Sequence, residues 1–162
     1  MTQQPSVPFK LSMQKPMAGA YFLRSKYVKI GRKVYICGYR TDGNVANQQP
    51  LFMVWDLDAM QMTELPPPPC SGAAMRDLQI QLSQSHGKVV FPFTMGPEGE
   101  INGIHVYDPA TATWATDDQR PDEASIGPFI GNSFVSLPDG RVAFAGGAEG
   151  RQQRAMWFYE AI

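Results

Sequence analysis

The chain has 162 residues, of which 43% are hydrophobic and 18% charged, enough for one globular domain that buries roughly 70% of its unfolded surface. Fourteen basic residues against fifteen acidic ones give a net charge of -1, which excludes the strong field that attracts nucleic acid or an anionic membrane. No apolar run approaches the ~20 residues of a membrane span, and the first sixteen residues lack the features of a signal peptide. We therefore predict a cytoplasmic protein without nucleic-acid or membrane partners.

The distribution of proline, glycine and cysteine predicts an all-β fold. The 14 prolines and 15 glycines stand between short runs rich in β-branched and aromatic residues, a pattern typical of strands joined by turns. Cys37 and Cys70 are the two cysteines, and they have neither CxxC spacing nor the density of a disulfide framework. We interpret both thiols as packing residues.

The first predicted element is a strand over residues 9–12. The segment FKLSMQKPMAGAY from Phe9 resembles MTELPPPPCSGAA from Met62, and the glycines near their ends, Gly19 and Gly72, are 53 residues apart. The segment at Met62 follows a predicted third strand, so it is expected to be the fourth strand of a sheet. Residues 9–12 are then a fourth strand separated from its own sheet.

The next element recurs three times as an apolar run that predicts a strand buried on both faces. The copies are GRKVYICGY from Gly31, GKVVFPFTM from Gly87 and DGRVAFAGG from Asp139. Their shared valines, Val34, Val89 and Val142, are 55 and 53 residues apart. We expect each copy to be the second strand of a sheet.

A third strand is predicted after each of these runs. The triplets VWD, VYD and FYE, at residues 54–56, 106–108 and 158–160, are spaced by 52 residues both times. Asp56 and Asp108 are expected to begin turns into a fourth strand, in which Met62 and Trp114 each stand six residues beyond the aspartate.

Periods near 50 residues with these markers resemble the kelch repeat, and the double glycine of that repeat is kept at Gly146 and Gly147. The resemblance implies a β-propeller of the kelch and galactose oxidase-like kind, in which each repeat is a four-stranded blade. A β-sandwich of unrelated short strands is the alternative that the same alternation of turns and apolar runs allows. Three markers in register across three copies favour the propeller.

The strand count predicts three complete blades, about half of a ring. Blade 1 is expected over about residues 21–68, blade 2 over about 74–119, and blade 3 over about 126–162 without its outer strand. Blades of roughly 60° span half a circle, so residues 9–12 of one chain are expected to complete the last blade of a second chain. The prediction is a six-bladed propeller formed by a homodimer with strand exchange; a fragment of a longer propeller is the alternative.

Loops on one face of such a ring are the predicted place for a ligand. They fall at residues 13–24, 39–50, 65–77, 94–103, 117–131 and 146–155. Forked hydrogen bonds from arginine suit carboxylates and sugars, and solvated loop charges or salt bridges between blades are the structural alternative. Arg24 and Arg76 stand apart because both are expected to precede a first strand, the strand that lines the channel. The candidate ligand-binding residues are Arg24, Arg40, Arg76, Asp77, Glu100, Glu149, Arg151 and Arg154.

No catalytic residues, metal site or cofactor are predicted. His86 and His105 are the two histidines, too few for the zinc or copper sites of proteins, and no GxSxG motif, P-loop or paired carboxylates occur. The resemblance to kelch proteins implies a non-catalytic binding or scaffold module for a protein or a carbohydrate. The alternative is a small-molecule enzyme, such as a sugar mutarotase or isomerase that uses channel Arg and Glu residues for acid–base chemistry.

Overall fold

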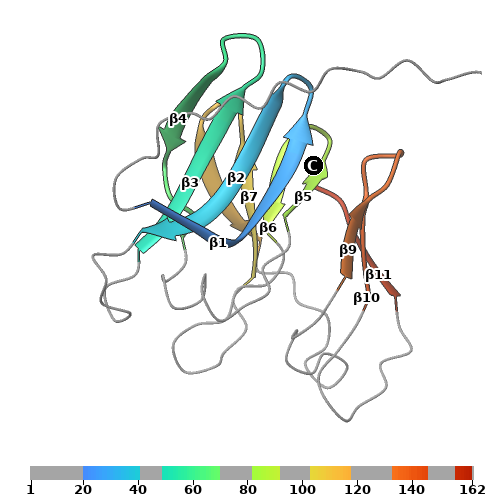
Figure 1. The fold of residues 1–162 in the computed structure, drawn as a ribbon. Helices are drawn as coiled ribbons and strands as arrows, with labels where there is room; N and C mark the ends of the chain where they lie inside the picture. Colours follow the sequence, from blue (N-terminus) through green and yellow to red (C-terminus); the bar gives the residue numbers. More distant parts are fainter. Residues whose placement is uncertain are drawn as a thin grey trace, which may run out of the picture.

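The computed structural model describes residues 20–40, 49–69, 82–91, 103–117, 133–145 and 156–161, and these residues form three antiparallel sheets (Figure 1). Sheet 1 contains β1 (Ala20–Ile30), β2 (Lys33–Arg40), β3 (Gln49–Asp56) and β4 (Gln61–Leu65). Sheet 2 contains β5 (Ser83–Ser85), β6 (Lys88–Phe91), β7 (Ile104–Asp108) and β8 (Thr113–Asp117). Sheet 3 contains β9 (Ser133–Ser136), β10 (Val142–Ala145) and β11 (Met156–Tyr159).

The strands of each sheet follow one another in chain order, so each sheet is a simple antiparallel meander. The predicted all-β class is confirmed for the described residues, which contain strands and turns but no helix. In that part of the chain, accordingly, no helix is long and apolar enough to cross a membrane.

The strand register shows that the three sheets are built from equivalent segments. The predicted second strands are β2, β6 and β10, and the triplet strands are β3, β7 and β11, each paired with the second strand of its own sheet. The shared valine of each second strand lies opposite the aromatic residue of the triplet. In sheets 1 and 2 that aromatic residue also lies opposite the residue of the fourth strand that stands six positions beyond the aspartate. The pairs are Val34 with Trp55, Val89 with Tyr107, Val142 with Tyr159, Trp55 with Met62, and Tyr107 with Trp114.

The predicted turns after Asp56 and Asp108 are present. The Asp56 carboxylate accepts hydrogen bonds from the backbone N–H groups of Asp58 and Ala59 at 2.9 and 3.0 Å, and Asp108 accepts one from Ala110 at 2.8 Å. These backbone donors lower the pKa of Asp56 because they stabilise the ionised carboxylate. Each aspartate therefore fixes the turn that returns the chain from the third strand to the fourth.

An aromatic core joins sheets 1 and 2. Phe52 of β3 packs against Tyr107 of β7 and Trp114 of β8, with ring centroids 5.0 Å apart in both pairs. The Trp114 Nε1–H also donates a hydrogen bond of 2.8 Å to the Pro66 carbonyl in the segment after β4. Cys37 is buried in this core, as its interpretation as a packing residue predicts. Trp114 thus attaches the outer strand of sheet 2 to sheet 1.

A second core joins the opposite face of sheet 2 to sheet 3. Val90 and Ile104 of sheet 2 pack with Val142 of β10 and Ala161, which follows β11. Val89 belongs to the first core and Val90 to the second, as expected for successive residues of a strand. Sheet 2 therefore lies between sheets 1 and 3, with both faces buried.

The innermost strands of neighbouring sheets lie side by side, because β5 contacts both β1 and β9. This arrangement resembles that of propeller blades, in which the first strands surround the axis. The predicted strand at residues 9–12 lies outside the described residues. Sheet 3 has three strands in the described part of the chain, so β11 has no neighbour there on its outer side.

Candidate functional site

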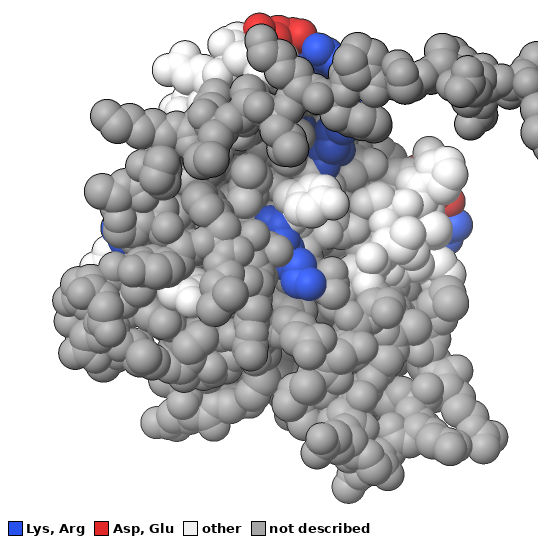
Figure 2. All heavy atoms as spheres, viewed as in Figure 1, with Lys and Arg blue, Asp and Glu red and all other residues white. Residues whose placement is uncertain are grey.

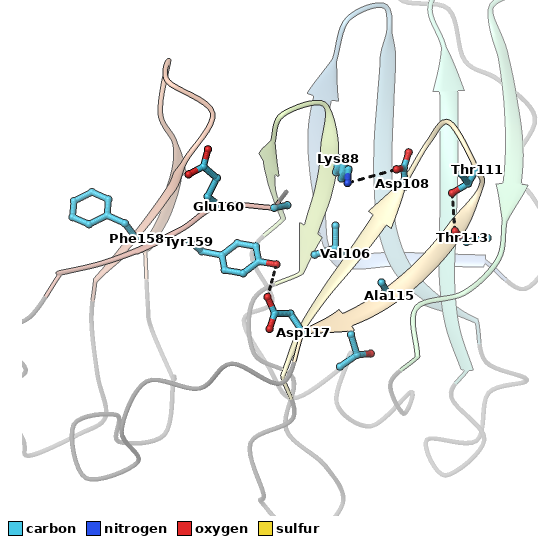
Figure 3. A pocket seen from close by; sticks show the side chains of 12 residues that line it. Lys88, Val106, Asp108, Thr111, Thr113, Ala115, Asp117, Phe158, Tyr159 and Glu160 are labelled. Carbon is cyan, nitrogen blue, oxygen red and sulfur yellow. Dashed lines mark hydrogen bonds and ion pairs between the residues drawn. The ribbon is translucent and has the colours of Figure 1, made fainter.

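A hollow of about 690 Å³ lies between the outer strands of sheet 2 and β11 (Figure 3). Its sheet 2 side is formed by alternate residues of β8, Thr113, Ala115 and Asp117, together with Val106 of β7. Its other side is formed by Tyr159, whose ring reaches toward sheet 2, whereas Phe158 points the opposite way. The hollow is thus bounded by two sheets, and its lining combines apolar and polar side chains.

Polar contacts hold the walls of the hollow. The Tyr159 hydroxyl donates a hydrogen bond of 3.2 Å to Asp117 Oδ2, and Lys88 Nζ lies 3.7 Å from Asp108 Oδ2. Burial raises the pKa of Tyr159, and the neighbouring Asp117 charge raises it further because it disfavours a phenolate. Tyr159 is therefore a hydrogen-bond donor at physiological pH.

Buried hydrogen bonds lock sheet 3 to sheet 2 beside the hollow. Ser85 Oγ donates to the Gly140 carbonyl at 2.6 Å and accepts from the Ala161 N–H at 2.9 Å. His86 lies 2.7 Å from Glu160 across the same seam, and its ring fills the space that a side chain at Gly140 would need. Gly140 also has φ +90°, a conformation that favours glycine.

Two of the predicted ligand-binding residues, Arg24 and Arg40, lie in the described part of the chain. Arg40 ends β2, and its guanidinium donates a hydrogen bond of 2.7 Å to Glu64 of β4, so it links two strands of one sheet. Arg24 lies inside β1, which begins at Ala20, so the expectation that Arg24 precedes the first strand is wrong. The other candidates lie outside the described residues; they are Arg76, Asp77, Glu100, Glu149, Arg151 and Arg154.

The described charges are distributed rather than gathered. Figure 2 shows Lys and Arg side chains at separate places on the face in view. Ion pairs such as those of Arg32 with Asp58 and Arg141 with Asp139 lie at strand ends and turns. Among the described residues, no three His, Cys, Asp or Glu side chains are grouped so that they could hold a metal ion.

The hollow was not predicted from the sequence. The alternation of Thr113, Ala115 and Asp117 with Trp114 and Thr116 was visible as a strand with small or polar residues on one side. What it could not show was that this side faces sheet 3, because that depends on how the sheets stack.

Replacing Tyr159 with phenylalanine should reduce the loss of stability at high pH. The pKa of Tyr159 is higher in the folded state than in the unfolded state, so its contribution to the free energy of unfolding is complete below pH 10. The contribution declines as the pH rises above 10, because the Tyr159 hydroxyl ionises first in the unfolded chain. One tyrosine can contribute at most about 1.4 kcal/mol per pH unit, and half-buried Tyr159 less. Urea unfolding between pH 8 and 11.5 measures the slope, which should be shallower in Tyr159→Phe.

Tyr27→Phe is the matched control, because Tyr27 is 74% exposed and its replacement leaves the Tyr159–Asp117 hydrogen bond in place. Tyr35 and Tyr107, whose pKa values are also raised by burial, leave a residual slope in both variants. Equal slopes for Tyr159→Phe and the unaltered chain would show that the Tyr159 hydroxyl is not coupled to folding.

The geometry defines the class of the chain as an all-β protein made of repeated antiparallel sheets packed face to face. Neither a protein-family model nor a curated protein matches its sequence. Solved structures do match it, among them the structure of YjhT, which is 20% identical with a TM-score of 0.53. That match covers 76% of this chain and 34% of YjhT, so the chain spans about a third of the length of YjhT. The similarity supports the fold and does not define a function.

Proposed function

We propose that the chain is half of a kelch-type β-propeller, that two copies assemble into one six-bladed ring, and that the ring is a non-catalytic binding module. The face-to-face packing of the sheets, the contacts between their first strands and the equivalent registers support the propeller. The ligand is a protein or a carbohydrate, held by the loop face or the central channel.

The observation that carries the proposal is the apolar character of the two ends of the stack. The sheet 3 end face contains Val135, Ala143 and Phe158, which pair across the strands; Val135 and Phe158 are 56% and 53% exposed. At the edge of this face the Arg141 guanidinium lies 4.9 Å from the centroid of the Phe158 ring. Their counterparts in sheet 2 are Val90 for Ala143 and Val106 for Phe158, and both pack against a following sheet. The sheet 3 end face therefore has the surface of a sheet that another sheet covers.

The other end of the stack, the outer face of sheet 1, also carries apolar side chains. The sheet 1 end face consists of Val34, Trp55 and Met62, which are cross-strand partners and so point to the same side. Their counterparts in sheet 2, Val89, Tyr107 and Trp114, pack against a preceding sheet. Within the described residues the buried Trp55 Nε1–H has no acceptor, whereas the Nε1–H of Trp114, the counterpart of Met62 on the corresponding face of sheet 2, has one in that preceding sheet.

A second copy offers both end faces a neighbouring sheet at once. The sheet 3 end face of one copy would meet the sheet 1 end face of the other, and a two-fold operation makes the same contact twice, so the ring closes. Burial of these apolar faces supplies the driving force for association.

Light scattering after size exclusion tests the assembly. The expected mass is about twice 17.9 kDa, and Phe158→Asp should reduce it to the monomer mass because it places a charge in the contact. Ala112→Asp is the control: it adds the same charge to an exposed turn outside both end faces, where φ is 55° and aspartate is tolerated. A monomer mass for the unaltered chain, or a dimer that survives Phe158→Asp, would contradict the ring.

A glycan array, followed by melting in the presence of each retained sugar, tests the binding function in its carbohydrate form. A saturating ligand at about 100 times its Kd should stabilise the protein by about 2.7 kcal/mol, visible as a raised Tm. Accelerated exchange between the anomers of a retained sugar, followed by NMR, would overturn the non-catalytic proposal in favour of a mutarotase. An array that retains no glycan would exclude the carbohydrate form.

A further inference from the structure

The outer edge of β11 differs from the corresponding edges of sheets 1 and 2. In sheets 1 and 2 the third strands, β3 and β7, pair with the fourth strands β4 and β8, so each third strand has a neighbouring strand on both sides. The described residues of sheet 3 end with β11 and place no strand on its outer side. Unpaired N–H and C=O groups along such an edge are a template for another extended segment.

The hollow beside this edge lies where a fourth strand would place its inward side chains. Between sheets 1 and 2 the equivalent space is occupied by Trp114, which packs on Phe52 and Phe91 with ring centroids 5.0 and 5.9 Å away. Between sheets 2 and 3 no described residue takes that role, and the hollow of about 690 Å³ remains over Val106 and Ala115. An aromatic side chain on a strand paired with β11 would enter this space.

We propose that the hollow and the β11 edge form an acceptor site for one extended peptide, residues Phe9–Ser12 of a second copy of this chain. The inference rests on the proposed ring and adds to it the site, the occupant and its register. Phe9 corresponds to Met62 at the 53-residue spacing of Gly19 and Gly72. Since Met62 lies opposite Trp55, Phe9 lies opposite Tyr159.

This register places the apolar side chains of the peptide on one face and its polar side chains on the other. Phe9 and Leu11 alternate with Lys10 and Ser12, so the apolar pair faces sheet 2 and the polar pair faces away. Phe9 then fills the hollow in the position that Trp114 occupies at the first interface. Four residues pair with the four residues of β11, with Ser12 opposite Met156.

Connectivity identifies the occupant as a second copy. The fourth strand of sheet 1, β4, is followed along the chain by β5, the first strand of the adjacent sheet. Residues 9–12 are followed by β1, so by the same connection they belong to a sheet adjacent to sheet 1. Sheet 3 of the same chain is not adjacent to sheet 1, because sheet 2 packs between them, whereas sheet 3 of the partner is adjacent in the ring.

Disulfide trapping tests the register and the occupant together. The double variant Lys10→Cys with Phe158→Cys places two thiols opposite each other on the face of the paired strands that is turned away from sheet 2, within the Cα distance that a disulfide allows. The matched control, Leu11→Cys with Phe158→Cys, keeps the change at Phe158 but turns the second thiol to the opposite face. Equal amounts of unlabelled and ¹⁵N-labelled chain are mixed, oxidised with copper–phenanthroline and mapped by mass spectrometry.

The expected result is a cross-link between residues 10 and 158 in most chains, about half of it joining a labelled to an unlabelled chain, with at least tenfold less in the control. A mass of twice 17.9 kDa without this cross-link would overturn the acceptor site and leave the ring standing. Cross-links confined to single chains would overturn the second copy as occupant. A monomeric unaltered chain would overturn the ring and this inference with it.

A second measurement does not depend on cross-linking. Phe9→Asp should raise the hydrogen-exchange rates of the β11 backbone amides at least tenfold, because a carboxylate does not enter the apolar part of the hollow. Ala112→Asp, which adds a carboxylate to an exposed turn outside both end faces, should change them less than twofold. Equal effects of the two variants would contradict the placement of Phe9 in the hollow.

Discussion

Replacing Phe52 with alanine is expected to lower the free energy of unfolding by about 3–5 kcal/mol, a large part of the stability of a domain of this size. Phe52 is 0% exposed and contacts three other aromatic rings, those of Tyr35, Tyr107 and Trp114. Its removal leaves a cavity between sheets 1 and 2, because rings held on two separate sheets can close it only in part. Urea unfolding followed by tryptophan fluorescence measures the change.

Lys29→Ala is the control for this prediction. It shortens a long side chain on the exposed side of β1, where surface substitutions change stability by no more than about 0.5 kcal/mol. If Phe52→Ala were within 1 kcal/mol of Lys29→Ala, the aromatic cluster would not be the element that holds sheets 1 and 2 together.

The repeat could be predicted from the sequence because the strands of each sheet carry local signals. The valine of each second strand, the aromatic residue of each triplet and the turn-forming Asp56 and Asp108 are all visible at fixed spacing. The structure confirms that the valines lie opposite the aromatic residues and that both aspartates accept backbone hydrogen bonds. Such features depend on a strand and its immediate neighbour, and a repeat shows them three times.

The site could not be predicted in the same way because it depends on contacts between sheets. The sequence analysis selected loop arginines for their chemistry, yet Arg40 pairs with Glu64, two strands away in its own sheet. The hollow depends on Tyr159 lying over β8, and Tyr159 and Asp117 are 42 residues apart in the chain. Which side chains meet across stacked sheets follows from the stacking, which no local pattern contains.

Replacing Ser85 with alanine is expected to detach sheet 3 selectively. Ser85 is fully buried, and its hydroxyl donates to the Gly140 carbonyl and accepts from the Ala161 N–H. The alanine leaves the buried Ala161 N–H and the half-buried Gly140 carbonyl without this partner. At about 1–3 kcal/mol for each group, the loss should be about 2–6 kcal/mol. Because both groups belong to the sheet 3 side of the seam, the opening should be local rather than global.

Hydrogen exchange resolves where the Ser85→Ala protein opens. Amides of Val142 and Tyr159 should exchange about 30-fold faster or more, as expected for a loss of 2 kcal/mol or above, whereas those of β2 and β3 should change little. Thr111→Ala is the control, since its hydroxyl bonds Thr113 at 2.7 Å in an exposed turn where water replaces the lost partner. Uniform acceleration in all three sheets would mean that the stack unfolds as one unit. No acceleration beyond that of Thr111→Ala would mean that the other contacts between sheets 2 and 3, such as the packing of Val90 with Val142 and the Tyr159–Asp117 hydrogen bond, hold sheet 3 in place without Ser85.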